Sequence, residues 1–397
     1  MQNDKLKPSL IIPIGLMLFS FFFGAGNLIF PPVLGQMAGE NIGWGMLGFC
    51  LSGVGFPLLG VLAVAMKKSD NPDAIAMPMH PLYARAVTVL CALAIGPLFA
   101  IPRTAAVSFD TGVSALLPAA FDGFGLPLYS VFFFILTYFF SINPSKIIGS
   151  IGNFLSPMLL ICLGVLVVCV LVNPTGSLQM PNPEFTTTPF FRGFQEGYNT
   201  MDLLAAILFG SITIKAIEAQ GITDKAVLTK LCSYAGLIAA FFLAIIYVAL
   251  AYTGALSINV FGIIPNGATL LSKICTYYMG FGGQIVLALI IFFACLTTSI
   301  GLTTAISGYF AELSNNRIQY ERLVLFISAF SLFVANFGLE NIINFSIPVI
   351  CMLYPIIIAL VILNIGHVII QDDSLTFRLC LTLTTIFAIF DGLRTTT

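Results

Sequence analysis

Three ionisable side chains, Arg103, Asp110 and Asp202, lie well inside long apolar segments of the chain. If these segments cross a membrane, each charge costs roughly 2.5–3.5 kcal/mol on insertion scales, which makes each residue a hypothesis for function. Asp202 follows the polar run 198–201, where it could hold a cation, attract an amine or carry a proton. Arg103 follows Pro102, a residue that we expect to bend its helix. We expect Arg103 to pair with Asp110, two turns further on, rather than to contact a substrate.

A glycine-rich interruption lies in the first apolar segment, at Phe23-Gly24-Ala25-Gly26-Asn27. Gly24 and Gly26 let the backbone leave helical geometry and let a ligand approach closely. A half-helix that starts near Asn27 would present free N–H groups and the positive end of its dipole to a carboxylate. The carbonyls freed at the end of the preceding half-helix, around Ser20 to Phe23, could bind Na⁺ or a substrate ammonium. This pattern favours a site for a zwitterion and a cation over a simple packing kink.

Hydroxyl side chains gather midway along a later apolar segment, at Thr297-Thr298-Ser299. Neutral oxygens of this kind suit a hard cation such as Na⁺. Hydroxyls in membrane helices also bond to the backbone or to neighbouring helices, so these three residues need support from elsewhere in the chain.

Transmembrane helices must position these residues, because the composition is that of a membrane protein. The 397 residues are 58% apolar and only 8% charged, whereas a soluble chain carries roughly 25% charged and about 45–50% apolar residues. This excludes a cytosolic enzyme and a disordered chain. The net charge of −1 argues against a nucleic-acid partner, since binding to phosphates needs a basic excess.

Eleven apolar segments are long enough to approach or cross a hydrocarbon core of about 30 Å. They lack the ten-residue alternation of a β-barrel, so helices are favoured. Most Lys and Arg residues fall on one side of the implied topology, which predicts a cytoplasmic N-terminus and, with eleven spans, an outside C-terminus. The predicted spans cover residues 10–34, 42–66, 82–117, 127–143, 146–172, 194–217, 227–256, 281–311, 322–337, 342–366 and 375–391.

The chain divides at the polar segment 173–193, which we interpret as a connector between two halves of one transmembrane domain. Each half opens with an interrupted helix, at 23–27 and at 198–202, the latter followed by Phe209-Gly210. Five helices per half is an odd number, so the second copy must cross the membrane in the opposite sense. Paired interrupted helices in inverted repeats indicate a transporter's central site. The predicted repeats cover about 10–172 and about 194–366, with an extra helix at about 375–391.

Four stretches carry a more specific signal: LFSFFFGAGNLIFPP at 18–32, GPLFAIPRTA at 96–105, GYNTMD at 197–202 and ACLTTS at 294–299. In the same order, they resemble the motifs of the bacterial branched-chain amino acid:cation symporters, a family of the amino acid–polyamine–organocation superfamily. The resemblance covers nearly the whole chain. It implies uptake of leucine, isoleucine and valine with Na⁺ or H⁺, and no other cofactor, on a five-plus-five inverted-repeat (LeuT-type) fold with discontinuous helices 1 and 6. It also implies a multi-pass protein of the bacterial inner (plasma) membrane.

The resemblance also implies roles for particular residues. Gly24 to Asn27 match the unwound first helix that binds the substrate carboxylate, and Asp202 matches a sixth-helix position beside substrate and ion. Thr298 and Ser299 match the hydroxyls of a Na⁺ site that carbonyls near Ser20 and Phe23 complete. The predicted substrate site comprises Phe23, Gly24, Ala25, Gly26, Asn27, Thr200, Asp202, Phe209 and Gly210. The family commonly has twelve spans, so finding eleven leaves the oligomer contacts and the C-terminal side open.

Two other classes of membrane protein fit less well. A channel needs a continuous polar pore, whereas the polar residues here cluster at the middle of the spans. A membrane-embedded enzyme needs a nucleophile–base or metal constellation, and no group of His, Cys and carboxylate residues converges in these spans. Among transporters, a cation symporter of the same fold for an aromatic amino acid or a nucleobase is the alternative.

Overall fold

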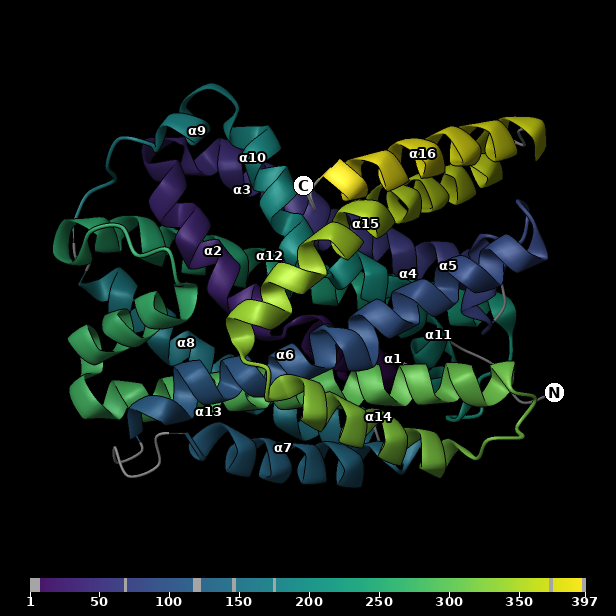
Figure 1. Ribbon diagram of the computed structural model, residues 1–397, viewed down its shortest axis with the longest axis horizontal. Coiled ribbons are helices and arrows are strands. Elements are labelled where there is room, and N and C mark those ends of the chain that lie inside the picture. Colours follow the sequence, from purple (N-terminus) through teal and green to yellow (C-terminus); the bar gives the residue numbers. More distant parts are fainter. Residues whose placement is uncertain are drawn as a thin grey trace.

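The computed structural model describes residues 8–67, 70–116, 123–144, 148–173, 176–370 and 374–394, and within these ranges every regular element is helical (Figure 1). The α-helices are α1 (Pro8–Phe22), α2 (Ala25–Ala38), α3 (Ile42–Cys50), α4 (Phe56–Met66), α5 (Pro81–Leu93), α6 (Ala100–Val107), α7 (Gly125–Ser141), α8 (Ser156–Val172), α9 (Pro183–Thr187), α10 (Pro189–Glu196), α11 (Asp202–Glu218), α12 (Lys225–Phe261), α13 (Gly267–Leu313), α14 (Tyr320–Ala335), α15 (Leu339–Ile370) and α16 (Ser374–Arg394).

Short segments of 3₁₀- or π-helix join several of these helices. The 3₁₀ segments are η1 (Gly39–Asn41), η3 (Pro72–Ile75), η6 (Ser114–Leu116) and η10 (Gly197–Thr200). The π segments are η2 (Leu51–Gly55), η4 (Ala94–Leu98), η5 (Ser108–Val113) and η9 (Ile148–Leu155).

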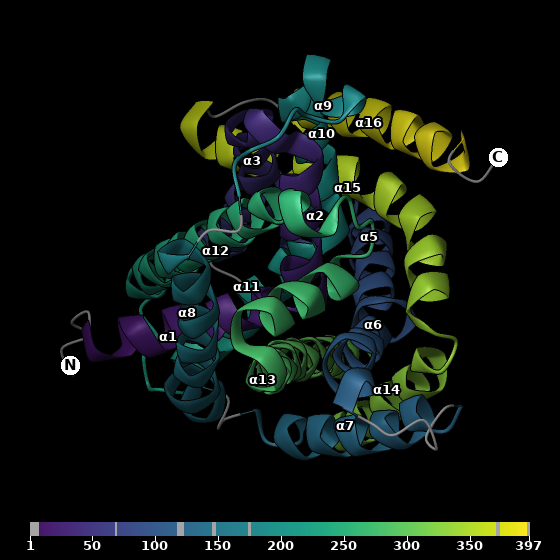
Figure 2. The ribbon, with the colours of Figure 1, turned by 90° about the vertical axis from the view of Figure 1, so that its left-hand side faces the viewer.

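Each predicted span corresponds to one helix or to a run of consecutive helical segments. Within the described residues, seven helical runs are long and apolar enough to cross a membrane, or eight if the bent pair 189–200 and 202–218 is one span. Two apolar helices, Leu10–Phe22 and Gly125–Ser141, are shorter. Figures 1 and 2 show α7 and α14 on one side of the molecule, α9, α10 and α16 on the opposite side, and α11 between them.

Both predicted helix interruptions occur, although their details differ from expectation. The first break separates α1 from α2 at Phe23-Gly24, so the second half-helix begins at Ala25 and not near Asn27. The second break lies at Met201, which adopts left-handed backbone geometry (φ 63°), and the helices on either side are bent by 49°. The Phe209-Gly210 pair lies inside the continuous helix α11, so it is not part of that break.

The predicted span 82–117 bends at Gly96, six residues before Pro102. Gly96 leaves helical geometry (φ −89°, ψ −126°) directly before Pro97, because a proline ring disfavours helical geometry in the preceding residue. Pro102 lies in the first turn of α6, where its missing N–H leaves no hydrogen bond unmade. The expectation that Pro102 bends the helix is therefore wrong.

The connector between the two halves is also more ordered than a polar loop. It contains α9, and α10 begins at Pro189, so the helix before the second break starts five residues earlier than predicted. Both helices begin with a proline, whose fixed φ suits the first helical position.

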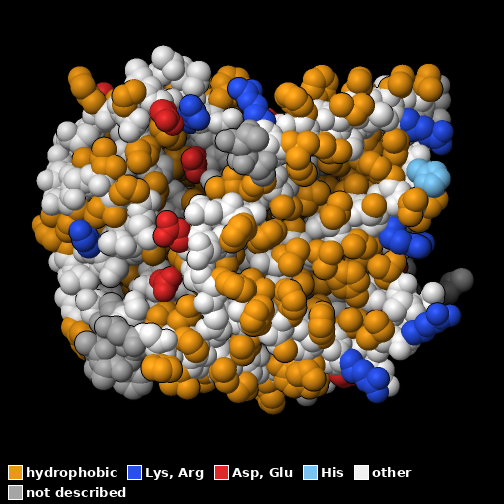
Figure 3. Space-filling model, in the orientation of Figure 1, with side chains coloured by type: hydrophobic (Ala, Val, Ile, Leu, Met, Phe, Trp, Pro, Cys, Tyr) orange, Lys and Arg blue, Asp and Glu red, His pale blue; other side chains and the backbone are white. Residues whose placement is uncertain are grey.

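The two ends of the molecule differ in charge. The connections α4–α5, α13–α14 and α15–α16 lie at the same end as the N-terminus in Figure 1. Figure 3 shows Lys and Arg side chains along that end, whereas acidic side chains gather near a hollow toward the other end. This distribution agrees with the lysine and arginine bias in the sequence.

Helices α2 and α12 pack backbone against backbone at two glycines, one in each helix. A Cβ atom on Gly35 would lie 1.8 Å from the carbonyl oxygen of Ala251, and one on Gly254 would lie 2.0 Å from that of Pro32. Small residues allow membrane helices to approach this closely. The contact fixes the half-helix α2, which begins at the first break, against the long helix α12.

We predict that Gly35→Ala destabilises the protein by about 2 kcal/mol or more, because the added methyl group meets a backbone carbonyl. The yield of monodisperse protein and its thermal midpoint measure this effect. Gly164→Ala in α8 is the matched control, since a Cβ there has no neighbour within 4 Å. Equal behaviour of the two variants would contradict the packing of α2 on α12.

Candidate functional site

A central cavity lies where the two broken helices meet. Residues from the end of α1, the start of α2, η4, α6, the second break, α11 and α13 line it. The cavity is narrow in this conformation, so a bound amino acid must move some lining side chains apart. The lining residues are Phe21, Phe22, Gly24, Ala25, Gly26, Asn27, Ile95, Ala100, Arg103, Thr104, Thr200, Met201, Asp202, Ala205, Phe209, Thr298 and Leu302.

Asp202 anchors a polar network that joins both breaks. Its Oδ2 accepts a hydrogen bond of 2.6 Å from the Asn27 amide and one of 3.1 Å from the Tyr247 hydroxyl. The Asn27 amide also contacts the Tyr247 hydroxyl. The Asn27 side-chain oxygen accepts from the backbone N–H of Gly24 at 3.3 Å. Asn27 therefore connects the start of α2 with the start of α11.

The fold also favours a carboxylate at position 202 and holds the backbone around it. Asp202 is the first residue of α11, where the positive end of the helix dipole favours a negative charge. Its backbone N–H donates to the Thr200 hydroxyl at 3.4 Å, and the next N–H, of Leu203, donates to the Tyr354 hydroxyl at 3.4 Å. We did not predict Tyr247 or Tyr354 as site residues, because single tyrosines in apolar segments resemble ordinary core residues.

Arg103 does not pair with Asp110, contrary to expectation. Its guanidinium donates to the carbonyl oxygens of Asn199 at 3.0 Å and Thr200 at 3.5 Å, at the end of η10. The ion pairs among the described residues join Arg192 with Glu184 and Lys215 with Asp70 and Glu312. The Gly96 bend precedes α6, and Arg103 lines the central cavity, while Asp110 lines a different, outer cavity.

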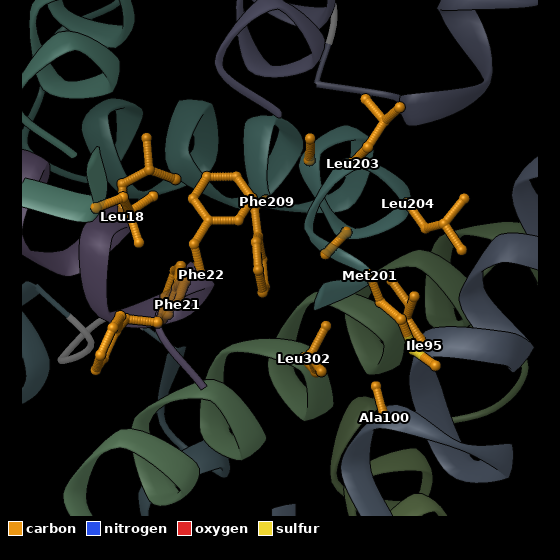
Figure 4. Packing of buried hydrophobic residues seen from close by; sticks show 14 of the residues in the cluster. Leu18, Phe21, Phe22, Ile95, Ala100, Met201, Leu203, Leu204, Phe209 and Leu302 are labelled. Carbon is orange, nitrogen blue, oxygen red and sulfur yellow. The ribbon is translucent and has the colours of Figure 1, made fainter. Parts of the chain in front are cut away.

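Aromatic and aliphatic side chains form the apolar part of the cavity. The rings of Phe21 and Phe22 lie 5.1 Å and 5.2 Å from the ring of Phe209. Figure 4 shows these three rings grouped together, with Ile95 near Met201 on the other side. A site with a polar network at one end and apolar side chains at the other suits an amphipathic ligand.

The hydroxyl cluster of α13 contacts the end of α1, as a Na⁺ site would require. The carbonyl oxygen of Ser20 accepts hydrogen bonds from the hydroxyls of Thr297 at 3.1 Å and Thr298 at 3.3 Å. The Ser299 hydroxyl lies 3.2 Å from that of Thr137 in α7. Thr298 and Ser20 thus lie together, whereas Ser299 contacts a neighbouring helix.

Two residues of the predicted substrate site are absent from the lining of the central cavity. The ring of Phe23 stacks on Phe19, with centroids 5.3 Å apart. A Cβ atom on Gly210 would lie 3.1 Å from Val64, so Gly210 lets α11 pack against α4. The other seven predicted substrate residues line the cavity, as does Thr298.

A second cavity is wider than the central one and has acidic side chains in its lining. Asp110, Glu196 and Glu340 line it together with Phe30. The ring centroid of Phe30 lies 5.9 Å from the guanidinium carbon of Arg103. Because Arg103 lines the central cavity, this contact joins the linings of the two cavities.

Solved structures with the same architecture define the fold. The chain is similar to MhsT in complex with L-phenylalanine (TM-score 0.63, 16% identity, 96% of this chain and 97% of that one). It is also similar to Mhp1, a nucleobase-cation-symport-1 family transporter (TM-score 0.61, 15% identity, 97% and 91%). The chain therefore has the LeuT-type fold of membrane transporters with broken helices, which confirms the predicted fold class.

Sequence relatives define the family. Residues 7–397 match the family described as "Branched-chain amino acid transport protein". The chain is 44% identical to the branched-chain amino acid permease BrnQ of Bacillus subtilis, over 99% of this chain and 89% of that protein. It is 36% identical to BrnQ of Escherichia coli (99% and 88%) and 38% identical to the branched-chain amino acid transport system 2 carrier protein of Pseudomonas aeruginosa (98% and 88%).

The chain belongs to the branched-chain amino acid transport family, as the four motifs predicted. It is a multi-pass membrane transport protein and not an enzyme.

We predict that Asp202→Asn weakens leucine affinity by about tenfold or more, equivalent to about 1.4 kcal/mol. The amide keeps the shape of the carboxylate but removes its charge from the network with Asn27 and Tyr247. Folded yield should stay near that of the wild type, because no salt bridge is broken. Leucine binding to purified protein and size-exclusion chromatography measure the two quantities.

Asp391→Asn, in the exposed part of α16, is the control and should leave leucine affinity unchanged. If Asp202 is instead a structural partner of Arg103, Asp202→Asn should fold poorly. Recovery of both yield and leucine binding in the double variant with Arg103→Gln would then contradict the role in the site.

Proposed function

We propose that this chain imports leucine, isoleucine and valine by symport with Na⁺. The observation that carries the proposal is the central cavity, where both helix breaks, a carboxylate and an apolar surface meet. Membership of the family supports the substrate class, because the related permeases and carriers are named for branched-chain amino acids.

Each part of a branched-chain amino acid has a matching part of the cavity. The first turn of α2, at Ala25 and Gly26, has backbone N–H groups without intrahelical partners, which suit the substrate carboxylate. Asp202 suits the ammonium group. The aromatic group of Phe21, Phe22 and Phe209 suits an aliphatic side chain, because burying apolar surface there is favourable.

The geometry near Ser20 supports Na⁺ as the coupling ion. Its carbonyl oxygen lies beside the hydroxyls of Thr297 and Thr298, and neutral oxygens of this kind suit a hard cation. None of these groups takes up or releases a proton near neutral pH, so none of them can couple transport to H⁺. The carbonyl of Phe23 and the hydroxyl of Ser299 are further proposed ligands. Coupling to H⁺ would instead require a titrating group such as Asp202.

We further propose that the protein lies in the bacterial inner membrane with its N-terminus in the cytoplasm. The clustering of Lys and Arg at the N-terminal end supports this orientation (Figure 3). Residues 10–172 and 194–366 are the proposed inverted repeats. In this orientation the wider cavity lined by Glu196 and Glu340 opens to the outside, where the substrate would enter.

Uptake of labelled leucine into proteoliposomes tests the proposal directly. Na⁺ and pH gradients are imposed separately, and unlabelled valine, isoleucine, phenylalanine and uracil are used as competitors. We expect inward Na⁺ gradients to drive uptake and only the branched-chain amino acids to compete strongly. Uptake that proceeds equally well in choline buffer on a proton gradient would contradict Na⁺ coupling. Strong competition by phenylalanine or uracil alone would favour the other substrate classes.

We predict that Thr298→Ala raises the Na⁺ concentration for half-maximal uptake by about fivefold, since losing one oxygen ligand costs roughly 1 kcal/mol. Leucine affinity at saturating Na⁺ should change little. Thr303→Val is the matched control: Thr303 is buried in the same helix, but its hydroxyl contacts no polar partner in the described structure. An identical Na⁺ dependence for both variants would remove Thr298 from the ion site.

A further inference from the structure

We propose that Arg103 is the side chain that binds the substrate carboxylate, together with the first turn of α2. This inference rests on the proposed function, in that the ligand is an amino acid. It goes beyond that function by adding a specificity-determining cation that neither the sequence motifs nor the expected pairing with Asp110 assigned to the substrate.

Arg103 is a buried cation whose charge is only partly compensated. Only 4% of its surface is exposed, and its Nε has no hydrogen-bond partner. Its two nearest acceptors are the backbone carbonyls of Asn199 and Thr200, at the negative end of η10. Backbone carbonyls carry partial charges, whereas a guanidinium stays fully ionised in proteins. Burying such a charge without an anion is costly, so the site favours an anionic ligand.

Arg103 lies beside the N-terminal end of α2, the end of a helix that suits an anion. A Cβ atom on Gly26 would lie 3.0 Å from Nη2 of Arg103, so the absence of a side chain at Gly26 allows the guanidinium to reach the first helical turn. Both residues line the central cavity. A carboxylate bound between them would accept hydrogen bonds from the backbone N–H groups of that turn and from Nε of Arg103.

The carboxylate of the cavity does not form an ion pair with Arg103. Oδ2 of Asp202 accepts from Asn27 and Tyr247, and Asp202 forms no salt bridge with Arg103 among the described residues. The cavity thus holds a cation and a carboxylate that do not form a salt bridge with each other among the described residues. This is the charge pattern that an α-amino acid zwitterion complements, with its carboxylate at Arg103 and its ammonium near Asp202.

A purely structural role is the competing explanation, since Arg103 also holds the carbonyls at the second break in place. The two roles differ in one property. A structural clamp affects all ligands alike, whereas a carboxylate-binding residue distinguishes leucine from leucinamide, which has the same side chain and amine but no carboxylate.

Titration of purified protein with leucine and with leucinamide, followed by thermal stabilisation, separates these roles. We expect the wild type to bind leucine at least about 30-fold more tightly than leucinamide, the loss expected when a buried charge partner is removed. In Arg103→Gln this ratio should fall to within about threefold, through weaker leucine binding alone. Arg103→Lys keeps the charge but not the planar fork, so its ratio should be intermediate. Arg85→Gln, at an exposed position of α5, should keep the wild-type ratio.

The remaining outcomes of this titration contradict either the proposal or the proposed function. An unchanged ratio in Arg103→Gln, with both ligands bound less tightly, would overturn the proposal in favour of the structural clamp. If Arg103→Gln does not fold, Arg103→Lys decides, and leucine affinity equal to that of the wild type would overturn it. A wild-type ratio near one overturns it without any variant. A wild type that binds neither ligand contradicts the proposed function instead.

Discussion

Backbone N–H and C=O groups that leave a helix within a membrane need partners, because lipid supplies none. Each break in this protein is surrounded by side chains that meet this need. Asn27 accepts from the N–H of Gly24, and Arg103 donates to the carbonyls of Asn199 and Thr200. Thr297 and Thr298 donate to the carbonyl of Ser20. These polar side chains stabilise the breaks, and the breaks in turn create the cavity.

The same side chains give the cavity its chemical character. Asp202 accepts from neutral donors and Arg103 donates to neutral acceptors, and the two opposite charges form no salt bridge with each other among the described residues. Phe21, Phe22 and Phe209 supply an apolar surface nearby. A site of this kind favours ligands that carry both charges over ligands that carry one, since a ligand lacking either charge leaves one buried group without a partner.

The sequence predicted the fold class, the family and both breaks, because helix length, glycine placement and four motifs are local signals. It did not predict contacts between distant segments. Tyr247 lies in an apolar stretch of α12, and nothing local indicates that it reaches Asp202. Spacing along one helix favours Asp110 as the partner of Arg103, but the bend at Gly96-Pro97 and the second break decide where the Arg103 side chain lies. A glycine after an aromatic residue suggests a break at Gly210, but this residue lies at a helix contact.

The most direct test of this account is a structure of the protein determined with leucine and Na⁺ bound in a lipid nanodisc. We predict leucine density between the two breaks, with the carboxylate at the first turn of α2 and Arg103, the ammonium toward Asp202 and the side chain against Phe209. Leucine bound only in the outer cavity beside Glu196 and Glu340 would contradict the account. A central ligand with its carboxylate turned away from Arg103 would contradict it as well.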